Sequence, residues 1–104
     1  MGSHPIFPRE EFAARVTRLR AELKEAGVVL GLFDEIEAMA WISGYGNSEN
    51  RWRCVGIPTD PTSDPFFLIR VLDSGPCRDR IWYDDVPTFR DWDDPQQALA
   101  AVLQ

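Results

Sequence analysis

The hydrophobic pattern changes at Gly27, and this change limits the fold more than any other feature of the sequence. Apolar side chains recur before it at helical spacing, at Phe12, Val16, Leu19 and Leu23. This spacing predicts an amphipathic helix over residues 8–26 that ends at a glycine C-cap. The uninterrupted apolar run at residues 28–33 then predicts a strand buried on both faces. A helix followed directly by a buried strand favours an α/β domain.

Further elements continue the alternation of helix and strand. The predicted elements are, in chain order, a short helix at 34–42 capped by Asp34, a loop at 43–48, a strand at 51–57, a hairpin connection at 58–65, a strand at 66–71, a loop or short helical turn at 72–79 and a strand at 81–83. Asp94 and Pro95 predict the N-cap and first turn of a closing helix. On the first helix, the face opposite the apolar stripe is expected to be solvated and carries Arg15, Arg18, Glu22 and Lys24.

The acidic charge and the lack of a long apolar run exclude several function classes. The formal net charge of −6 opposes binding to nucleic acid and to anionic membrane surfaces. No stretch approaches the roughly 20 apolar residues of a membrane span, and no secretory signal begins the chain. The sequence therefore predicts a cytoplasmic protein. Cys54 and Cys77 predict one buried thiol and one loop thiol rather than a disulfide framework.

Metal binding and nucleophilic catalysis find little support in the sequence. Five acids gather near the end, at Asp84, Asp85, Asp91, Asp93 and Asp94. Hard cations take oxygen ligands, but this spacing matches no EF-hand loop, so solvated loop acids are expected. His4 is the single histidine and lies in a stretch that resembles a cloning scar, so a Ser or Cys nucleophile lacks a base. A stand-alone enzyme using carboxylates near Asp84 and Asp94 remains an alternative.

The segment Arg51-Trp52-Arg53 follows a glycine-rich loop and is a candidate binding site. In a strand, Arg51 and Arg53 would point to one face and Trp52 to the other. Two guanidinium groups on one face could clamp a carboxylate. The alternative is an edge strand with solvated arginines and a core tryptophan.

The chain as a whole resembles the N-terminal domain of the creatinase/prolidase/aminopeptidase P family, the pita-bread metallohydrolases. The matching segments are Arg18-Leu19-Arg20 with Leu23, Leu32-Phe33, Trp41-Ile42-Ser43-Gly44-Tyr45, Phe67-Leu68-Ile69-Arg70, and Ile81-Trp82-Tyr83-Asp84-Asp85 with Trp92 and Asp94-Pro95. Residues 34–45 lack the Asp-Pro-x-Asn of aminopeptidase P and resemble the creatinase-like branch. The resemblance covers residues 9–104.

This resemblance implies an α/β fold, a mixed β-sheet flanked by helices that is ribonuclease-H-like in outline. Residues 1–7 would be a tag remnant or flexible N-terminus, and residues 8–104 a truncated creatinase/prolidase N-terminal-type domain. The family's catalytic domain carries two Asp, one His and two Glu that usually hold two divalent metals, and it would lie outside this chain. No catalytic residue, metal ligand or cofactor is therefore expected in the chain itself.

The resemblance also implies a function and a set of contact residues. The chain would be the non-catalytic N-terminal domain of a metal-dependent hydrolase of the Xaa-Pro peptidase, creatinase or ectoine-hydrolase type. It would form a homodimer and close the partner subunit's pocket around a small carboxylate or peptide substrate. The candidate substrate-binding residues are Arg51, Trp52, Arg53 and Tyr45. The alternative is a peptide- or protein-interaction module without catalysis, whose contact patch would comprise Arg51, Trp52, Trp41 and Tyr45.

Overall fold

A four-stranded mixed sheet organises the part of the chain that the computed structural model describes, residues 7–46 and 52–104. The elements are α1 (Arg9–Glu25), β1 (Leu30–Phe33), α2 (Ile36–Ser43), β2 (Cys54–Pro58), β3 (Phe66–Arg70), α3 (Val71–Arg80), β4 (Thr88–Phe89) and α4 (Pro95–Val102). The strand order is β1-β2-β3-β4, with β1, β2 and β3 antiparallel in turn and β4 parallel to β3. The predicted α/β class with a mixed, helix-flanked sheet is confirmed.

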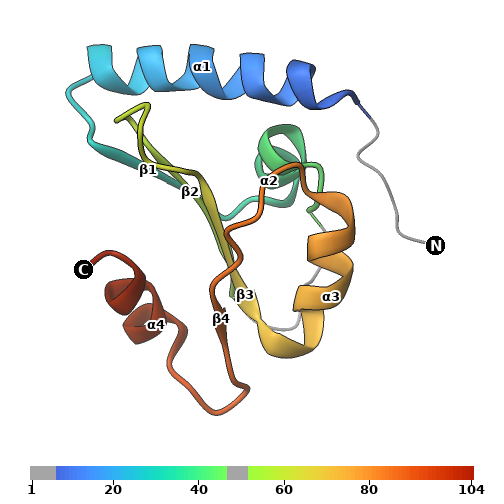
Figure 1. Cartoon of the computed structure of the whole chain (residues 1–104). Helices are drawn as coiled ribbons and strands as arrows, with labels where there is room; N and C mark the ends of the chain where they lie inside the picture. The colour runs from blue at the N-terminus through green and yellow to red at the C-terminus, as the bar shows by residue number, and fades with distance from the viewer. Residues whose placement is uncertain (1–6, 47–51) are drawn as a thin grey trace.

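Helices cover both faces of this sheet (Figure 1). α1, α2 and α3 pack on one face, and α4 packs alone on the other. The larger core lies under the three helices and contains Val16, Met39, Ile42, Val55, Ile57, Phe67, Ile69, Cys77, Ile81, Tyr83 and Val86. The smaller core lies under α4 and contains Cys54, Phe66, Leu68 and Phe89. None of the helices in the described residues is long and apolar enough to cross a bilayer.

The first helix forms where the periodicity predicts it. It starts after Pro8 and ends before Gly27, whose φ of 77° allows the left-handed turn that closes the helix. Phe12 and Val16 are buried, as expected: Val16 belongs to the core under the helices, and the Phe12 ring stacks on Trp82. Arg15, however, is only 8% exposed, so its assignment to the solvated face is wrong.

Within the described residues, β1 stands at the end of the strand order, and it is not buried on both faces. It begins at Leu30 and pairs with β2, while Val29 and Leu32 are 82% and 44% exposed. A continuous apolar run does not by itself distinguish a central strand from an edge strand. At the end of the strand order, β1 has a neighbouring strand on one side only, and some of its side chains stay exposed.

α3 is a full helix of 10 residues where the sequence predicts a loop or a short helical turn. It contains Gly75 and Pro76, which both disfavour a helix interior. The Arg70 guanidinium donates to both Asp73 carboxylate oxygens, at 3.0 and 3.2 Å, and this pair holds the first turn. Cys77 is fully buried against the sheet. Tertiary packing here outweighs the local propensity of the chain.

The sequence predicts a strand at 81–83, but this prediction is wrong: β4 begins at Thr88, seven residues after the predicted start. The ladder bonds of β3 show why: the amides of Phe67 and Ile69 donate to the carbonyls of Asp85 and Pro87, at 3.0 and 3.2 Å. The segment leading into β4 therefore takes the edge of β3, and residues 81–83 contribute core side chains instead. The closing helix begins as predicted, with the Asp94 carboxylate accepting from the Gln96 amide at 2.9 Å.

Candidate functional site

The turn at the end of α2 is fixed by Ser43 and Gly44. Ser43 is fully buried, and its hydroxyl donates to the Met39 carbonyl at 2.7 Å while accepting from the Tyr45 amide at 3.2 Å. Gly44 has a φ of 96°, a left-handed conformation that a side chain would strain. The Ser-Gly-aromatic segment therefore ends the helix and sets the position of Tyr45.

Tyr45 lies on the larger core with part of its ring accessible. Its ring packs against Phe67 at a centroid distance of 5.9 Å. Burial raises the pKa of the Tyr45 phenol, and the charges of Arg80 and Arg53 oppose this shift. The phenol is therefore neutral at physiological pH and available as a hydrogen-bond donor. Sequence reasoning missed Arg80, which falls between the loop predicted at 72–79 and the strand predicted at 81–83 and instead ends α3.

Trp52 and Arg53 both contact Asp34, the residue that follows β1. The Trp52 indole donates to the Asp34 carboxylate at 3.0 Å, and the Arg53 guanidinium donates to the Asp34 carbonyl at 3.4 Å. These bonds join the end of β1 to the segment that enters β2. Asp34 serves here as an anchor and not as the predicted helix cap, because Glu35 occupies the N-cap position of α2.

The strand alternation expected at 51–57 does not apply to this segment, because β2 begins at Cys54. Trp52 and Arg53 precede the strand and turn toward the same residue. Within the described part of the chain, the Arg53 Nε atom is buried without a hydrogen-bond partner. Arg51 lies outside the described residues. Of the four candidate residues, the structure thus brings together Trp52 and Arg53, with the Arg53 charge also acting on Tyr45.

The acidic residues near the C-terminus are largely engaged in local structure. Asp91 pairs with Arg70 at 3.3 Å, and Asp93 pairs with Arg90 at 3.2 Å. Hydrogen bonds from the Arg90 amide and guanidinium lower the pKa of Asp93. Within residues 7–46 and 52–104, no group of three or more His, Cys, Asp or Glu side chains is placed to hold a metal ion.

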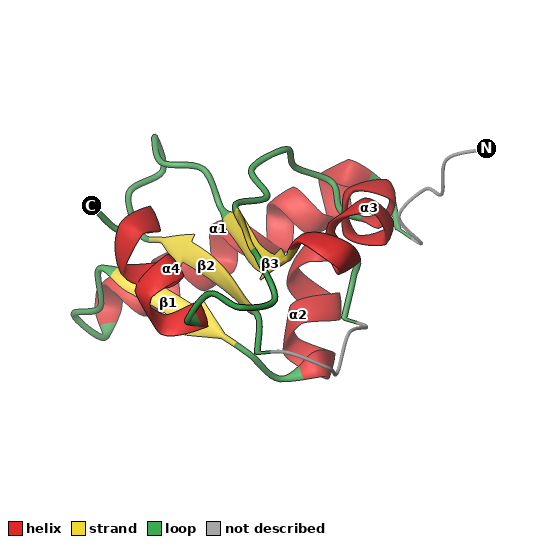
Figure 2. Ribbon diagram, turned by 90° about the horizontal axis from the view of Figure 1, so that it is seen from below, coloured by secondary structure: helices red, strands yellow, loops and turns green. Residues whose placement is uncertain are grey.

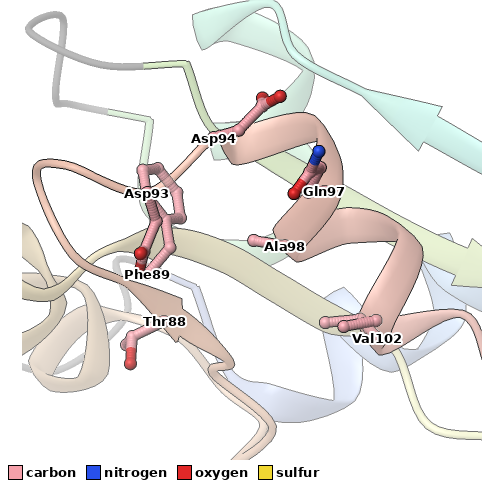
Figure 3. A pocket seen from close by; sticks show the side chains of 8 residues that line it. Thr88, Phe89, Asp93, Asp94, Gln97, Ala98 and Val102 are labelled. Carbon is pink, nitrogen blue, oxygen red and sulfur yellow. The ribbon is translucent and has the colours of Figure 1, made fainter.

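A hollow of about 470 Å³ lies between β4 and α4 (Figure 3). Its lining comprises Thr88, Phe89, Asp93, Asp94, Gln97, Ala98, Ala101 and Val102. The two carboxylates at its rim already accept hydrogen bonds, Asp93 from the Arg90 amide and Asp94 from the Gln96 amide. The hollow therefore combines a polar rim, already engaged in local structure, with apolar side chains of β4 and α4.

Both cysteines are free and fully buried, Cys54 in β2 and Cys77 in α3. The expectation of one loop thiol is therefore wrong. Burial raises the pKa of each thiol to about 12. A reactive thiolate requires a lowered pKa, so these side chains are core residues and not nucleophiles.

The raised thiol pKa values predict a loss of stability at alkaline pH. In the unfolded chain each thiol ionises near its ordinary pKa of 9.0, whereas in the folded chain it stays neutral up to about 12. The stabilisation is complete below pH 9 and is lost as the pH rises through this window. Urea unfolding at about pH 8 and about pH 10.5 should show the decrease, and a Cys54→Ala/Cys77→Ala double variant should show a smaller one. An equal decrease in the free energy of unfolding for the parent chain and the double variant would show that the two thiols do not cause it.

Comparison with known proteins shows which solved structures have the same fold. No protein-family profile and no curated protein sequence matches the chain. Among solved structures, the creatinase/prolidase N-terminal domain of an X-Pro dipeptidase from Streptococcus pyogenes matches with a TM-score of 0.76 and 19% identity, over 86% of this chain and 66% of that one. The N-terminal domain of Xaa-Pro dipeptidase from Lactobacillus brevis matches with a TM-score of 0.77 and 14% identity, over 86% and 66%.

A longer relative matches at the same level. Dipeptidase PepE from Mycobacterium ulcerans aligns with a TM-score of 0.77 and 18% identity, over 93% of this chain and 27% of that one. The chain spans about two thirds of the length of the N-terminal domain structures and about a quarter of this dipeptidase. The chain therefore has the fold of the N-terminal creatinase/prolidase-like domain of Xaa-Pro dipeptidases.

Proposed function

We propose that this chain is the non-catalytic N-terminal domain of a metal-dependent hydrolase of the Xaa-Pro peptidase, creatinase or ectoine-hydrolase type. The observation that carries the proposal is the match of nearly the whole chain to one segment of a longer dipeptidase and to separate N-terminal domains of X-Pro dipeptidases. In this proposal the divalent metal ions belong to a catalytic domain outside the chain. A cytoplasmic location is part of the same proposal, supported by two buried free thiols.

The proposed role of the domain is to form a homodimer and to close the partner subunit's substrate pocket. The residues proposed for this contact are Arg51, Trp52, Arg53 and Tyr45. Arg53 supports the proposal because its guanidinium donates to the Asp34 carbonyl at 3.4 Å, which helps to hold the side chain in place. A positioned guanidinium suits a substrate carboxylate, since less side-chain entropy is lost on binding.

The test is an assay of the purified 104-residue chain with Xaa-Pro dipeptides and Mn²⁺, Zn²⁺ or Co²⁺. The expected result is hydrolysis no faster than in a blank without protein, because the proposal places the catalytic groups in another domain. Turnover by the pure chain would overturn it. Loss of such turnover in Asp84→Asn or Asp94→Asn variants would identify a stand-alone enzyme instead, and asparagine at residue 94 retains the helix cap.

A second candidate, an interaction module without catalysis, is favoured by one observation. Trp41 is 45% exposed on α2, and Trp and Tyr dominate the energetics of many protein contacts. Tryptophan fluorescence during titration of the isolated chain with Xaa-Pro peptides separates the two functions. Saturable binding that is lost in Trp41→Ala would support the module. A flat titration supports the pocket-closing role, because that pocket also needs the catalytic domain that the proposal places outside the chain.

A further inference from the structure

The last turn of α2 receives hydrogen bonds from two distant parts of the chain. A helix ends with carbonyl groups that have no partner within the helix itself. In α2 the carbonyls of Trp41 and Ile42 belong to this group. The Arg15 guanidinium donates to the Trp41 carbonyl at 2.8 Å, and the Trp82 indole donates to the Ile42 carbonyl at 2.7 Å. The two donors, named here the α2 donors, lie 26 and 40 residues away from their acceptors in the sequence.

Local hydrogen bonds do not reach these two carbonyls. The Gly44 amide donates to the Ala40 carbonyl at 2.9 Å, which is the last such bond along the helix. The Tyr45 amide, next in the chain, donates to the Ser43 hydroxyl at 3.2 Å. The local chain therefore closes the helix as far as Ala40, and the two carbonyls beyond it depend on the α2 donors.

The α2 donors are themselves held in place by α1. α2 lies beside α1 and α3 on the same face of the sheet, as Figure 2 shows. The Trp82 ring stacks on Phe12 with a centroid distance of 6.4 Å, and the Arg9 guanidinium lies 5.9 Å from its centroid. The Arg15 guanidinium lies 5.1 Å from the same Phe12 ring. Both donors thus pack on one buried aromatic side chain, which fixes the directions of their N–H groups.

The end of α2 carries Tyr45, one of the residues proposed above for substrate contact. Gly44 turns the chain with its φ of 96°, and Tyr45 follows directly. A Cβ on Gly46 would overlap the Ile36 carbonyl oxygen, so the backbone after Tyr45 lies against the first turn of α2. The phenol ring then packs on Phe67. Because the backbone on both sides of Tyr45 leans on α2, a displacement of the helix end would also displace the phenol.

We propose that Arg15 and Trp82 are positioning residues for Tyr45, which act by holding the last carbonyls of α2. They act through the backbone of the helix and the turn that follows it. A phenol that is already fixed loses little conformational entropy when a ligand binds, so Tyr45 would bind better with both α2 donors in place. The inference rests on the proposed function only for what the phenol contacts.

A role of Trp82 in the core alone would have different consequences. Trp82 packs against the larger core, so any change of this side chain affects global stability. The indole N–H, in contrast, bonds to the Ile42 carbonyl. Trp82→Phe keeps an aromatic ring that can stack on Phe12 and removes the N–H. This substitution therefore separates the hydrogen bond to α2 from the packing of the ring.

Native-state hydrogen exchange of the full chain, followed by NMR, tests the coupling in Trp82→Phe. The amides of Gly44 and Tyr45 report on the turn, and the Ile69 amide, which donates to the Pro87 carbonyl at 3.2 Å, reports on the sheet. The expected result is exchange at Gly44 and Tyr45 that is faster by about tenfold, beyond any change at Ile69. An equal change at all three amides, or no change at all, would overturn the proposal.

Trp92→Phe is the matched control, because it makes the same chemical change at a side chain that is 76% exposed. Exchange at Gly44 and Tyr45 should stay at the rate of the parent chain in this variant. The same acceleration in Trp92→Phe as in Trp82→Phe would show that the effect does not come from the bond to Ile42, and would contradict the proposal.

Arg15→Met removes the other α2 donor and gives an independent test if Trp82→Phe does not fold. The amides of Gly44 and Tyr45 should again exchange faster than the Ile69 amide accounts for, and an equal change at all three would overturn the proposal. Failure of the proposed function is seen in a different experiment. Turnover by the pure chain would reject that function and leave the coupling of the α2 donors to Tyr45 intact.

Discussion

Phe67→Ala is expected to lower the free energy of unfolding by about 4 kcal/mol, the largest effect of any substitution proposed here. Phe67 is fully buried in β3 and belongs to the larger core between the sheet and the three helices that cover it. Its ring packs against Tyr45 at 5.9 Å, so truncation also removes the support of the Tyr45 phenol. Urea unfolding followed by circular dichroism measures the loss.

The control for Phe67→Ala is Leu72→Ala, which removes an apolar side chain of similar chemistry from the surface. Leu72 is 69% exposed, so its truncation should change the unfolding free energy by less than about 0.5 kcal/mol. The free energy of unfolding of a small domain is only about 5–15 kcal/mol, so the loss expected for Phe67→Ala is a large fraction of the total stability. A loss below about 1.5 kcal/mol would show that the core around β3 is not packed as described.

Arg15→Met is expected to cost about 3 kcal/mol, although it replaces a charged residue of a helix by an apolar one of similar length. Arg15 is 8% exposed, and its guanidinium donates to the Trp41 carbonyl at 2.8 Å, a bond that joins α1 to α2. It also donates to the Glu11 carboxylate at 3.1 Å. Methionine would leave the Trp41 carbonyl without this donor in a part-buried site.

Aromatic rings surround the same guanidinium and add to the expected loss. Its central carbon lies over three rings, at 4.7 Å from Phe7, 5.1 Å from Phe12 and 5.1 Å from Trp41. Each cation–π contact contributes on the order of 0.5–1 kcal/mol. Arg18→Met is the matched control, because Arg18 is exposed on the same helix and should change stability little. Equal unfolding free energies for the two variants would show that Arg15 does not join the helices.

Much of the fold could be predicted where local chemistry and tertiary packing agree. The helical spacing before Gly27 predicts α1, and the Asp94-Pro95 pair predicts the start of α4. α3 could not be predicted, because Gly75 and Pro76 oppose a helix and the ion pair between Arg70 and Asp73 favours one only after folding. The position of β4 depended on which segment reaches the open edge of β3, a long-range pairing without a local signal.

The candidate site shows the same division. The Ser43-Gly44-Tyr45 turn has a local cause, since a left-handed residue after a helix needs glycine. The contacts of Trp52 and Arg53 with Asp34 depend on the pairing of β1 with β2, which brings residues 18 and 19 positions apart together. Their roles in substrate binding remain predictions, and so does the role of Arg51, which lies outside the described residues.

By itself, the sequence determined the alternation of helices and strands, because the period of apolar residues and the positions of glycine and proline act within a few residues. The tertiary structure alone decided which apolar segments are covered. Residues 28–33 and Phe66–Arg70 both consist almost entirely of apolar residues, yet in the described sheet β3 is central and buried while β1 is the outer strand. Burial depends on neighbours brought from distant parts of the chain. For the same reason, Arg15 is buried among aromatic rings despite its place on the polar face of α1.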